Sequence, residues 1–177
     1  MNTQEDIKQW LDEHNVKSYR INEDLSIDVI GNVNLSKKNF THIPVKFNIV
    51  KGNVDCSHNM LTDIFFSPVK VNYFDCSQNK IVSLKGAPQC VEATFKCNNN
   101  KLLSLEYAPE IIKLDFNCSY NPLFELGNLI TQIGRMFIFE AQDKYKIKGL
   151  ERYYDFRKSV RLTNQEFQQV LAKIKNK

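Results

Sequence analysis

Several features that would identify an enzyme or a membrane protein are missing from this sequence. No apolar run approaches the roughly 18 residues that would span a bilayer. The polar, acidic opening at residues 1–6 is not followed by the apolar core of a signal peptide. The six glycines are scattered, so none forms a phosphate-binding loop, and no HExxH or EF-hand pattern occurs. These absences predict a cytoplasmic protein and argue against phosphate-loop and metalloprotease chemistry.

Histidine is also scarce, which limits the catalytic chemistry that the chain can carry. His14, His42 and His58 are the only histidines, and none accompanies a nucleophile in a local motif. His58 lies close to Cys56, but a strand through Cys56 would direct its thiol inward while His58 follows the strand. We therefore predict a protein that is not an enzyme, with no catalytic residue and no cofactor.

The composition is that of an ordinary folded domain. The chain has 177 residues, of which 42% are hydrophobic and 25% are charged. This length suits one domain with a sizeable core, and these fractions are typical of soluble proteins.

A short phrase containing cysteine recurs four times at nearly constant spacing. It occupies residues 55–59, 75–79, 96–100 and 117–121, and its cysteines are 20, 21 and 21 residues apart. A period of about 20 to 29 residues, with Asn after a short apolar–polar alternation, is typical of leucine-rich repeats. The spacing therefore predicts a stack of similar turns.

The second copy defines the columns of the predicted stack. Phe74 and Cys76 alternate with polar residues, which predicts a short strand, and Asn79 follows three residues after the cysteine. Ile81 and Leu84 continue the apolar series at a spacing that no longer fits a strand. Stacking would join the inward residues of all copies into one core, and the Asn amide would bond backbone groups of the adjacent turn. A degraded first copy begins at residue 33, as expected of a terminal repeat.

The repeated unit resembles the leucine-rich repeat family, and in particular short bacterial and bacteriophage proteins with tandem FDCSxNxLxSLxGAP units. The segment at residues 74–88 reads FDCSQNKIVSLKGAP, and residues 26–36 resemble the lead-in of those proteins. The resemblance covers about residues 19–126. It implies protein recognition on a concave strand face. It also implies a phage-encoded protein that inhibits or modulates a host or defence protein in the host cytoplasm.

The column of cysteines is expected to belong to the core. Parallel strands stack about 4.8 Å apart, so four cysteines in one column span about 14 Å, too far to share a tetrahedral zinc ion. In-register parallel side chains also rarely present the dihedral angle of a disulfide. We expect reduced cysteines that act as small apolar residues, with no metal site, while Cys90 lies off the column.

Different patterns at the two ends predict caps on the stack. Near the N-terminus, Ile7, Trp10 and Leu11 have helical spacing, and an alternating pair of segments flanks residues 22–24. Near the C-terminus, Thr163 and Glu166 form a capping box. We expect an N-terminal helix–hairpin cap at residues 1–31, repeats at 32–126 and a basic helical cap at 127–177.

After the last predicted repeat strand, three segments have helical spacing. One would begin at Asn121-Pro122, where proline suits a first turn, and would run towards Gly134. The apolar residues that suggest these helices are Leu123, Leu126, Ile130 and Ile133, then Leu150, Tyr153 and Tyr154, then Phe167, Val170, Leu171 and Ile174. The expected fold is thus an α/β leucine-rich repeat solenoid, short and right-handed, with about five repeats and a parallel strand ladder between two caps.

The outward-facing residues of the repeats form the first candidate site. The predicted partner-binding residues are Asn53, Asp55, Tyr73, Asp75, Thr94, Lys96, Asp115 and Asn117 on the strands, with His58, Gln78, Asn99 and Tyr120 at the edge that follows. This surface is polar and mildly acidic, and tyrosine is a favoured residue in binding hot spots. The primary prediction is a protein-binding module, although these side chains could also be ordinary solvated residues.

Two alternatives remain open. Residues 135–177 hold 11 Lys and Arg against 5 Asp and Glu, so this segment has the charge expected of a nucleic-acid contact. The residues concerned are Lys144, Lys146, Lys148, Arg152, Arg157, Lys158 and Arg161. A purely structural subunit would instead self-associate through the apolar run at residues 136–139.

Overall fold

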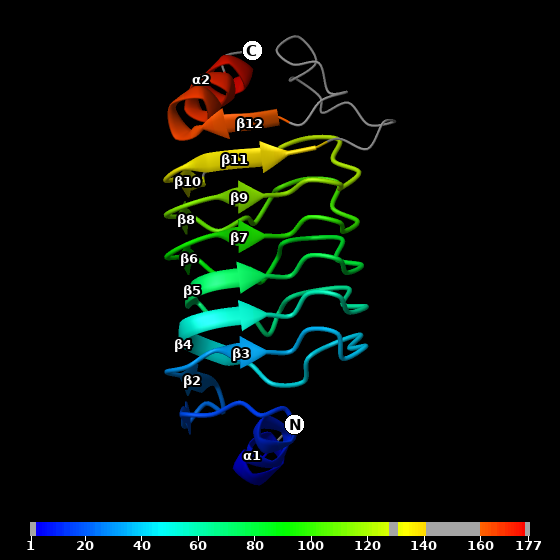
Figure 1. Cartoon of the computed structure of the whole chain (residues 1–177), viewed down its shortest axis with the longest axis vertical. Helices are drawn as coiled ribbons and strands as arrows, with labels where there is room; N and C mark the ends of the chain where they lie inside the picture. Colours follow the sequence, from blue (N-terminus) through cyan, green and yellow to red (C-terminus); the bar gives the residue numbers. More distant parts are fainter. Residues whose placement is uncertain (1–2, 128–130, 141–159, 176–177) are drawn as a thin grey trace.

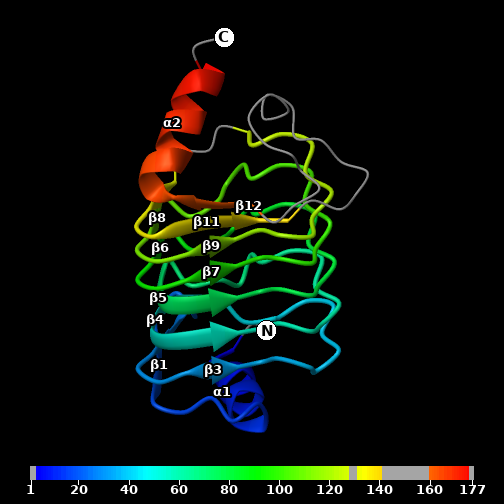
Figure 2. The same cartoon turned by 45° about the horizontal axis from the view of Figure 1, so that its top comes forward.

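The computed structural model is a parallel β-solenoid of about five turns with a helix at each end (Figure 1). The structure describes residues 3–127, 131–140 and 160–175. Helix α1 (Gln4–Glu13) and helix α2 (Asn164–Lys175) lie at opposite ends of the stack, and both views agree on this (Figures 1 and 2). Neither of these described helices is long and apolar enough to cross a bilayer.

Each turn of the solenoid contributes to two parallel ladders. The front ladder aligns its apolar residues at positions 33, 54, 74, 95, 116 and 137, so the repeat is 21 residues apart from one 20-residue step. Its strands are β3 (Val33–Asn34), β4 (Phe47–Asp55), β5 (Lys70–Asp75), β7 (Phe95–Lys96), β9 (Phe116–Asn117) and β11 (Met136–Phe139). The predicted spacing of the repeat is confirmed.

The second ladder runs beside the first, one corner earlier along the chain. The first halves of β4 and β5 belong to it, together with β2 (Ile27–Val29), β6 (Cys90–Val91), β8 (Ile111–Ile112) and β10 (Gln132–Ile133). Antiparallel strands flank the two ladders: β1 (Tyr19–Ile21) pairs with β2, and β12 (Val160–Thr163) pairs with β11. The β1–β2 pairing is the one that the sequence around residues 22–24 predicts.

Apolar columns fill the interior that the turns enclose. Phe74, Phe95 and Phe116 are fully buried, with ring centroids 5.7 and 5.6 Å apart in successive turns. Beyond them, Phe137 stacks on Phe167 of α2 with a centroid separation of 4.3 Å, so the helix continues the column. This continuity joins the last turn to the terminal helix through a direct aromatic contact.

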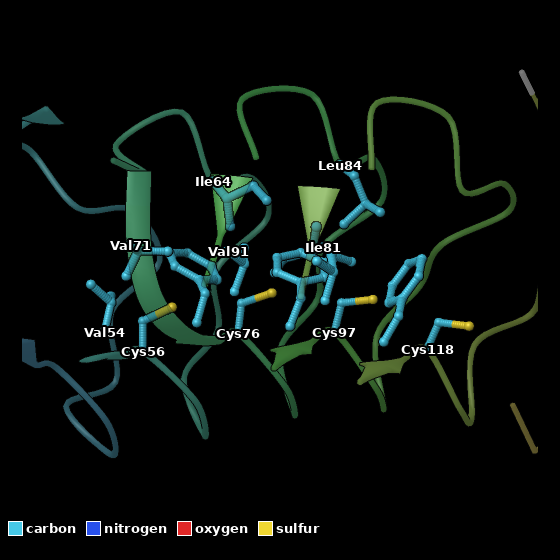
Figure 3. Packing of buried hydrophobic residues seen from close by; sticks show 14 of the residues in the cluster. Val54, Cys56, Ile64, Val71, Cys76, Ile81, Leu84, Val91, Cys97 and Cys118 are labelled. Carbon is cyan, nitrogen blue, oxygen red and sulfur yellow. The ribbon is translucent and has the colours of Figure 1, made fainter. Parts of the chain in front are cut away.

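The four cysteines of the repeat form a second core column, as predicted. Cys56, Cys76, Cys97 and Cys118 are fully buried free thiols, and Figure 3 shows them in a row with their sulfur atoms pointing the same way along the stack. The Cys56 Sγ donates to the carbonyl of Asp75 at 3.3 Å, and the other three make the same contact one turn further on. Burial raises the pKa of all four thiols, so they stay protonated and unreactive.

The asparagine that recurs from turn to turn has the structural role that the sequence predicts. The Asn100 Nδ2 donates to the carbonyls of Cys76 and Cys97 at 3.0 Å each, which belong to consecutive turns. Its Oδ1 accepts from the backbone N–H of Ile81 at 3.0 Å. The equivalent bonds are made by Asn59, Asn79 and Asn121. These buried amides satisfy backbone groups at the point where each turn leaves the strand.

The corner between the two ladders brings backbones of successive turns into close approach. A Cβ atom on Gly52 would collide with the carbonyl oxygen of Gly31, and one on Gly134 would collide with that of Lys113. The third turn lacks one residue at this corner, because Val71 and Phe74 are three apart where Val50 and Val54 are four apart. The corner therefore absorbs the one irregular step of the repeat.

Both terminal helices begin where the sequence predicts. Thr3 caps α1 by accepting from the backbone N–H of Asp6, and Ile7, Trp10 and Leu11 are buried. At the start of α2, the Glu166 carboxylate accepts from both the N–H and the hydroxyl of Thr163. The core-facing side of α2 consists of Phe167, Val170 and Leu171, while the side chain of Ile174 lies outside the described residues.

The predicted helix after Asn121-Pro122 is wrong. Residues 122–127 are irregular, and Ile133 pairs with Ile112 in the second ladder. The helical spacing of Leu123 and Leu126 is the apolar spacing of the repeat itself, which Leu102 and Leu105 share as buried core residues. The chain therefore continues the solenoid where an amphipathic helix was expected.

The rest of the C-terminal region also differs from an all-helical cap. Residues 136–139 form strand β11, so the front ladder extends beyond residue 126. Strand β12 then reverses direction before α2 begins. In the part of the chain that the structure describes, α1 and α2 are the two helices, and the predicted helix around Leu150 falls outside that part.

Candidate functional site

The structure places the predicted partner-binding residues on one side of the front ladder. Asn53 is in register with Tyr73, and Asp55, Asp75, Lys96 and Asn117 follow one another in adjacent strands. Thr94 and Asp115 precede the buried phenylalanines of the next two turns and accept hydrogen bonds from Phe74 and Phe95 respectively. We call this surface the front face.

One row of the front face has a structural role that the sequence interpretation missed. The Oδ1 atom of Asp55 accepts from the backbone N–H of Ser57 at 2.9 Å, and that of Asn117 accepts from Ser119 in the same way at 3.1 Å. Asp75 repeats this turn and also accepts from the Ser77 hydroxyl at 2.6 Å. The recurring Asp/Asn-Cys-Ser sequence was the signal, because short side-chain acceptors commonly bond the backbone two residues on.

Lys96 is the one residue of this row, from Asp55 to Asn117, that cannot make such a turn, since its side chain has no acceptor. Its ammonium nitrogen lies 3.7 Å from the Asp75 Oδ2 and 5.3 Å from the centre of the Tyr73 ring. The Tyr73 hydroxyl donates to the same Oδ2 atom at 2.8 Å. Tyr73, Asp75 and Lys96 are thus joined by a hydrogen bond, an ion pair and a cation–ring contact, and we call them the Tyr73 cluster.

The Tyr73 cluster is held in a partly buried setting. Asp75 is only 9% exposed, whereas Tyr73 and Lys96 are intermediate in exposure. Burial, together with the hydrogen bond to Asp75, raises the pKa of Tyr73, so its hydroxyl stays neutral and remains a donor. The cluster therefore presents an aromatic ring and an ammonium group in a fixed arrangement.

The acidic character predicted for this surface is largely compensated. Arg135 forms a two-point salt bridge with Asp115, in which Nε donates to Oδ1 at 2.6 Å. Arg135 was predicted as part of a separate basic segment, because its turn of the solenoid was expected to be helical. At the same end of the face, the Tyr120 hydroxyl donates to the carboxylate of Glu140.

The edge of the front face is a row of residues in the left-handed backbone conformation, which we call the ridge. Its φ values lie between 53° and 57° in Lys37, His58, Gln78, Asn99 and Tyr120. Glycine adopts this conformation without steric cost, whereas other residues do so at a cost of about 1 kcal/mol. All five side chains are exposed, so side chains are kept at positions where the backbone would favour glycine.

The structure describes little of the basic segment proposed for nucleic-acid binding, but it describes all of the apolar run proposed for self-association. Six of the seven residues proposed for nucleic-acid binding, from Lys144 to Lys158, lie outside the described residues, and Arg161 is exposed on β12. The apolar run at residues 136–139 pairs with β9 on one side and β12 on the other. Phe137 and Phe139 are buried, so this run already has partners within the chain.

Cys56 and His58, which are close in the sequence, do not form a catalytic pair. Cys56 is buried in the core and His58 is exposed on the ridge. Across the described ranges, 3–127, 131–140 and 160–175, no three or more His, Cys, Asp or Glu side chains gather in a way that could hold a metal ion.

Comparison with known proteins gives no further assignment for this arrangement. No protein-family model matches the chain, and no curated protein or solved structure shows significant similarity to it.

Proposed function

We propose that this chain is a non-enzymatic, leucine-rich-repeat-type module that binds a protein partner through the front face, with the Tyr73 cluster at the centre. The observation that carries the proposal is the cluster itself. Tyr73 and Lys96 depart from the repeating pattern of their neighbours and are held together through Asp75. Because other turns fold without this cluster, the fold alone does not account for it.

The leucine-rich-repeat assignment rests on the repeat itself. A spacing of about 21 residues, a ladder of buried asparagines and a parallel strand face are features of that family. The N-terminal helix with its antiparallel strands, and the C-terminal strand with its helix, would then act as caps that cover the apolar ends. The resemblance to phage proteins extends the proposal to a host or defence protein as the partner.

The charge of the front face favours a protein over a nucleic acid. Nucleic-acid binding needs unpaired lysine and arginine for the phosphates. Here Lys96 and Arg135 are paired with Asp75 and Asp115, and Asp55 adds a further carboxylate. A nearly neutral polar surface around a tyrosine instead suits the polar, aromatic character of protein interfaces.

The ridge supports the same conclusion. Five exposed side chains occupy left-handed positions at which glycine would be the less strained choice. Unfavourable backbone conformations are kept where a side chain has a use, and strained positions are common in binding sites. The ridge therefore extends the proposed contact surface along one edge of the front face.

The test is an affinity capture from bacterial cytoplasm, with and without phage infection, read by mass spectrometry with and without nuclease treatment. The test variant is Tyr73→Ala with Lys96→Glu, which leaves the structural oxygens of Asp55, Asp75 and Asn117 intact. The matched control is Tyr107→Ala with Lys101→Glu, which makes the same chemical changes at exposed positions outside the front face. Circular dichroism and thermal unfolding establish that both variants are folded.

We expect one protein to be retained by the wild type and the control and lost from the test variant. Truncating a central tyrosine typically costs about 2 kcal/mol or more, so the dissociation constant for that partner should rise about 30-fold. Equal capture by all three chains would refute the role of the Tyr73 cluster. Recovery of nuclease-sensitive material by all three would move the function to the basic C-terminal segment.

A further inference from the structure

A groove of about 510 Å³ lies at the N-terminal end of the solenoid and shares no residue with the Tyr73 cluster. Strands β1, β2 and β4 supply most of its walls, through residues that include Arg20, Asp28, Ile49 and Lys51, and Ile30 adds to them just after β2. Its volume falls within the range of about 300–1,000 Å³ that is typical of ligand pockets. The size makes the groove a candidate site, and the apolar and charged side chains that line it indicate the chemical class of the ligand.

The apolar part of the groove is not required by the fold. Ile30 follows Val29, which is in register with Val50, so Ile30 occupies the position taken by Lys51 in the next turn. Further along the stack the same position holds Glu92 and Lys113. Ile30 is 68% exposed, whereas the other turns have a charged residue at this position. The fold therefore does not need an apolar side chain here.

Ile49 provides the second apolar side chain beside Ile30. It is 40% exposed, and in the aligned positions of the next two turns the chain has Lys70 and Cys90. Two exposed isoleucines in neighbouring turns, one just after β2 and one within β4, give the groove an apolar surface whose contact with water is unfavourable.

The charged groups of the groove leave one positive charge in excess. The Asp28 carboxylate is fully engaged, since Oδ1 accepts from the side chain of Asn48 and the N–H of Ile49, and Oδ2 accepts from Arg20 at 2.9 Å. Lys51 adds a second cation at the groove. One carboxylate against two cations makes the lining suited to a ligand with a single negative charge.

We propose that this groove binds an aliphatic carboxylate of medium chain length. The hydrocarbon chain would lie against Ile30 and Ile49, and the carboxylate would contact Lys51 and the N–H groups of Arg20 that Asp28 leaves available. Arginine and lysine both form charge-assisted hydrogen bonds with carboxylates, and arginine keeps further donors when one is used. The site is independent of the front face and would function whether or not a protein partner binds there.

The experiment is a titration of the ¹⁵N-labelled full chain with decanoate below its micelle concentration, followed by backbone amide shifts. Decyltrimethylammonium, which has the same chain and the opposite charge, is titrated in parallel. Saturable shifts centred on residues 18–20, 28–30 and 49–51 are expected for decanoate alone. Equal binding of the two amphiphiles, or decanoate shifts spread over other parts of the chain, would overturn the proposal.

Two variants sharpen the result. Lys51→Gln should weaken decanoate binding about two- to fivefold, as expected for an exposed charge contact. Ile49→Ser should weaken it about tenfold through lost apolar contact. The matched control is Ile111→Ser, because Ile111 occupies the same position in β8, is 39% exposed and lies outside the groove. Equal weakening by Ile49→Ser and Ile111→Ser would mean that decanoate binds exposed apolar residues in general, and would refute the site.

Discussion

Replacing Asn100 with alanine should destabilise the chain more than the same change at Asn98, a half-buried asparagine of the same turn. The substitution removes two donations of 3.0 Å to the carbonyls of Cys76 and Cys97, a longer one of 3.4 Å to that of Asn98, and one acceptance of 3.0 Å from the N–H of Ile81. Asn100 is 3% exposed, so water cannot easily replace these partners. A buried donor left without a partner costs about 1–3 kcal/mol, and each lost bond adds about 1 kcal/mol. With the Ile81 N–H left unpartnered and the two 3.0 Å donations lost, the expected loss in the free energy of unfolding is about 3–5 kcal/mol.

Urea unfolding followed by far-ultraviolet circular dichroism measures this loss directly. Asn98→Ala is the matched control, because Asn98 lies in the same turn and contributes its backbone carbonyl to the neighbouring contacts with Gln78 and Asn100. That control should change the free energy of unfolding by no more than about 0.5 kcal/mol. If Asn100→Ala were as mild as Asn98→Ala, the buried amides would not be what joins successive turns, and this account of the fold would be wrong.

Two further predictions follow from the corner and from a surface ion pair. Gly52→Ala should destabilise the chain by about 1–3 kcal/mol, because the added Cβ meets the carbonyl of Gly31, whereas Gly31→Ala meets no atom within 4 Å and should be nearly neutral in the same urea assay. Hydrogen bonds from Lys113 and Lys70 lower the pKa of Glu92 from 4.5 to about 2, so this carboxylate favours the folded state above pH 4.5 and loses that contribution as the pH falls towards 2. Thermal unfolding between pH 2 and 7 should show a smaller acid-induced fall in melting temperature for Glu92→Gln than for the wild type; identical profiles would contradict the assignment.

The repeat columns could be predicted from the sequence because each column keeps one chemical type through several turns. Cys76, Phe74 and Asn79 each recur at about 21-residue intervals, and their burial follows from stacking. The same regularity misled the interpretation after Asn121, where the apolar spacing of the repeat coincides with that of a helix. Local periodicity cannot separate these two cases, but continued pairing with the previous turn can.

The candidate site was harder to predict because its contacts cross between turns. The Asp115–Arg135 salt bridge joins residues 20 positions apart, and Arg135 could be placed only once its turn was known to continue the ladder. The acceptor role of Asp55 could have been inferred from the serine two residues later. The exposure of Ile30 became meaningful only by comparison with Lys51 in the aligned position.

The asparagine ladder also bears on how such a surface can change during evolution. Each buried amide bonds only its own turn and the adjacent one, so no contact of the ladder depends on how many turns precede or follow it. An in-frame duplication of 21 codons would therefore add a complete turn and lengthen the front face by about 4.8 Å, with the bonds on both sides of the insertion re-formed by identical partners. A gene of this kind can lengthen or shorten the front face in whole turns without the core being redesigned.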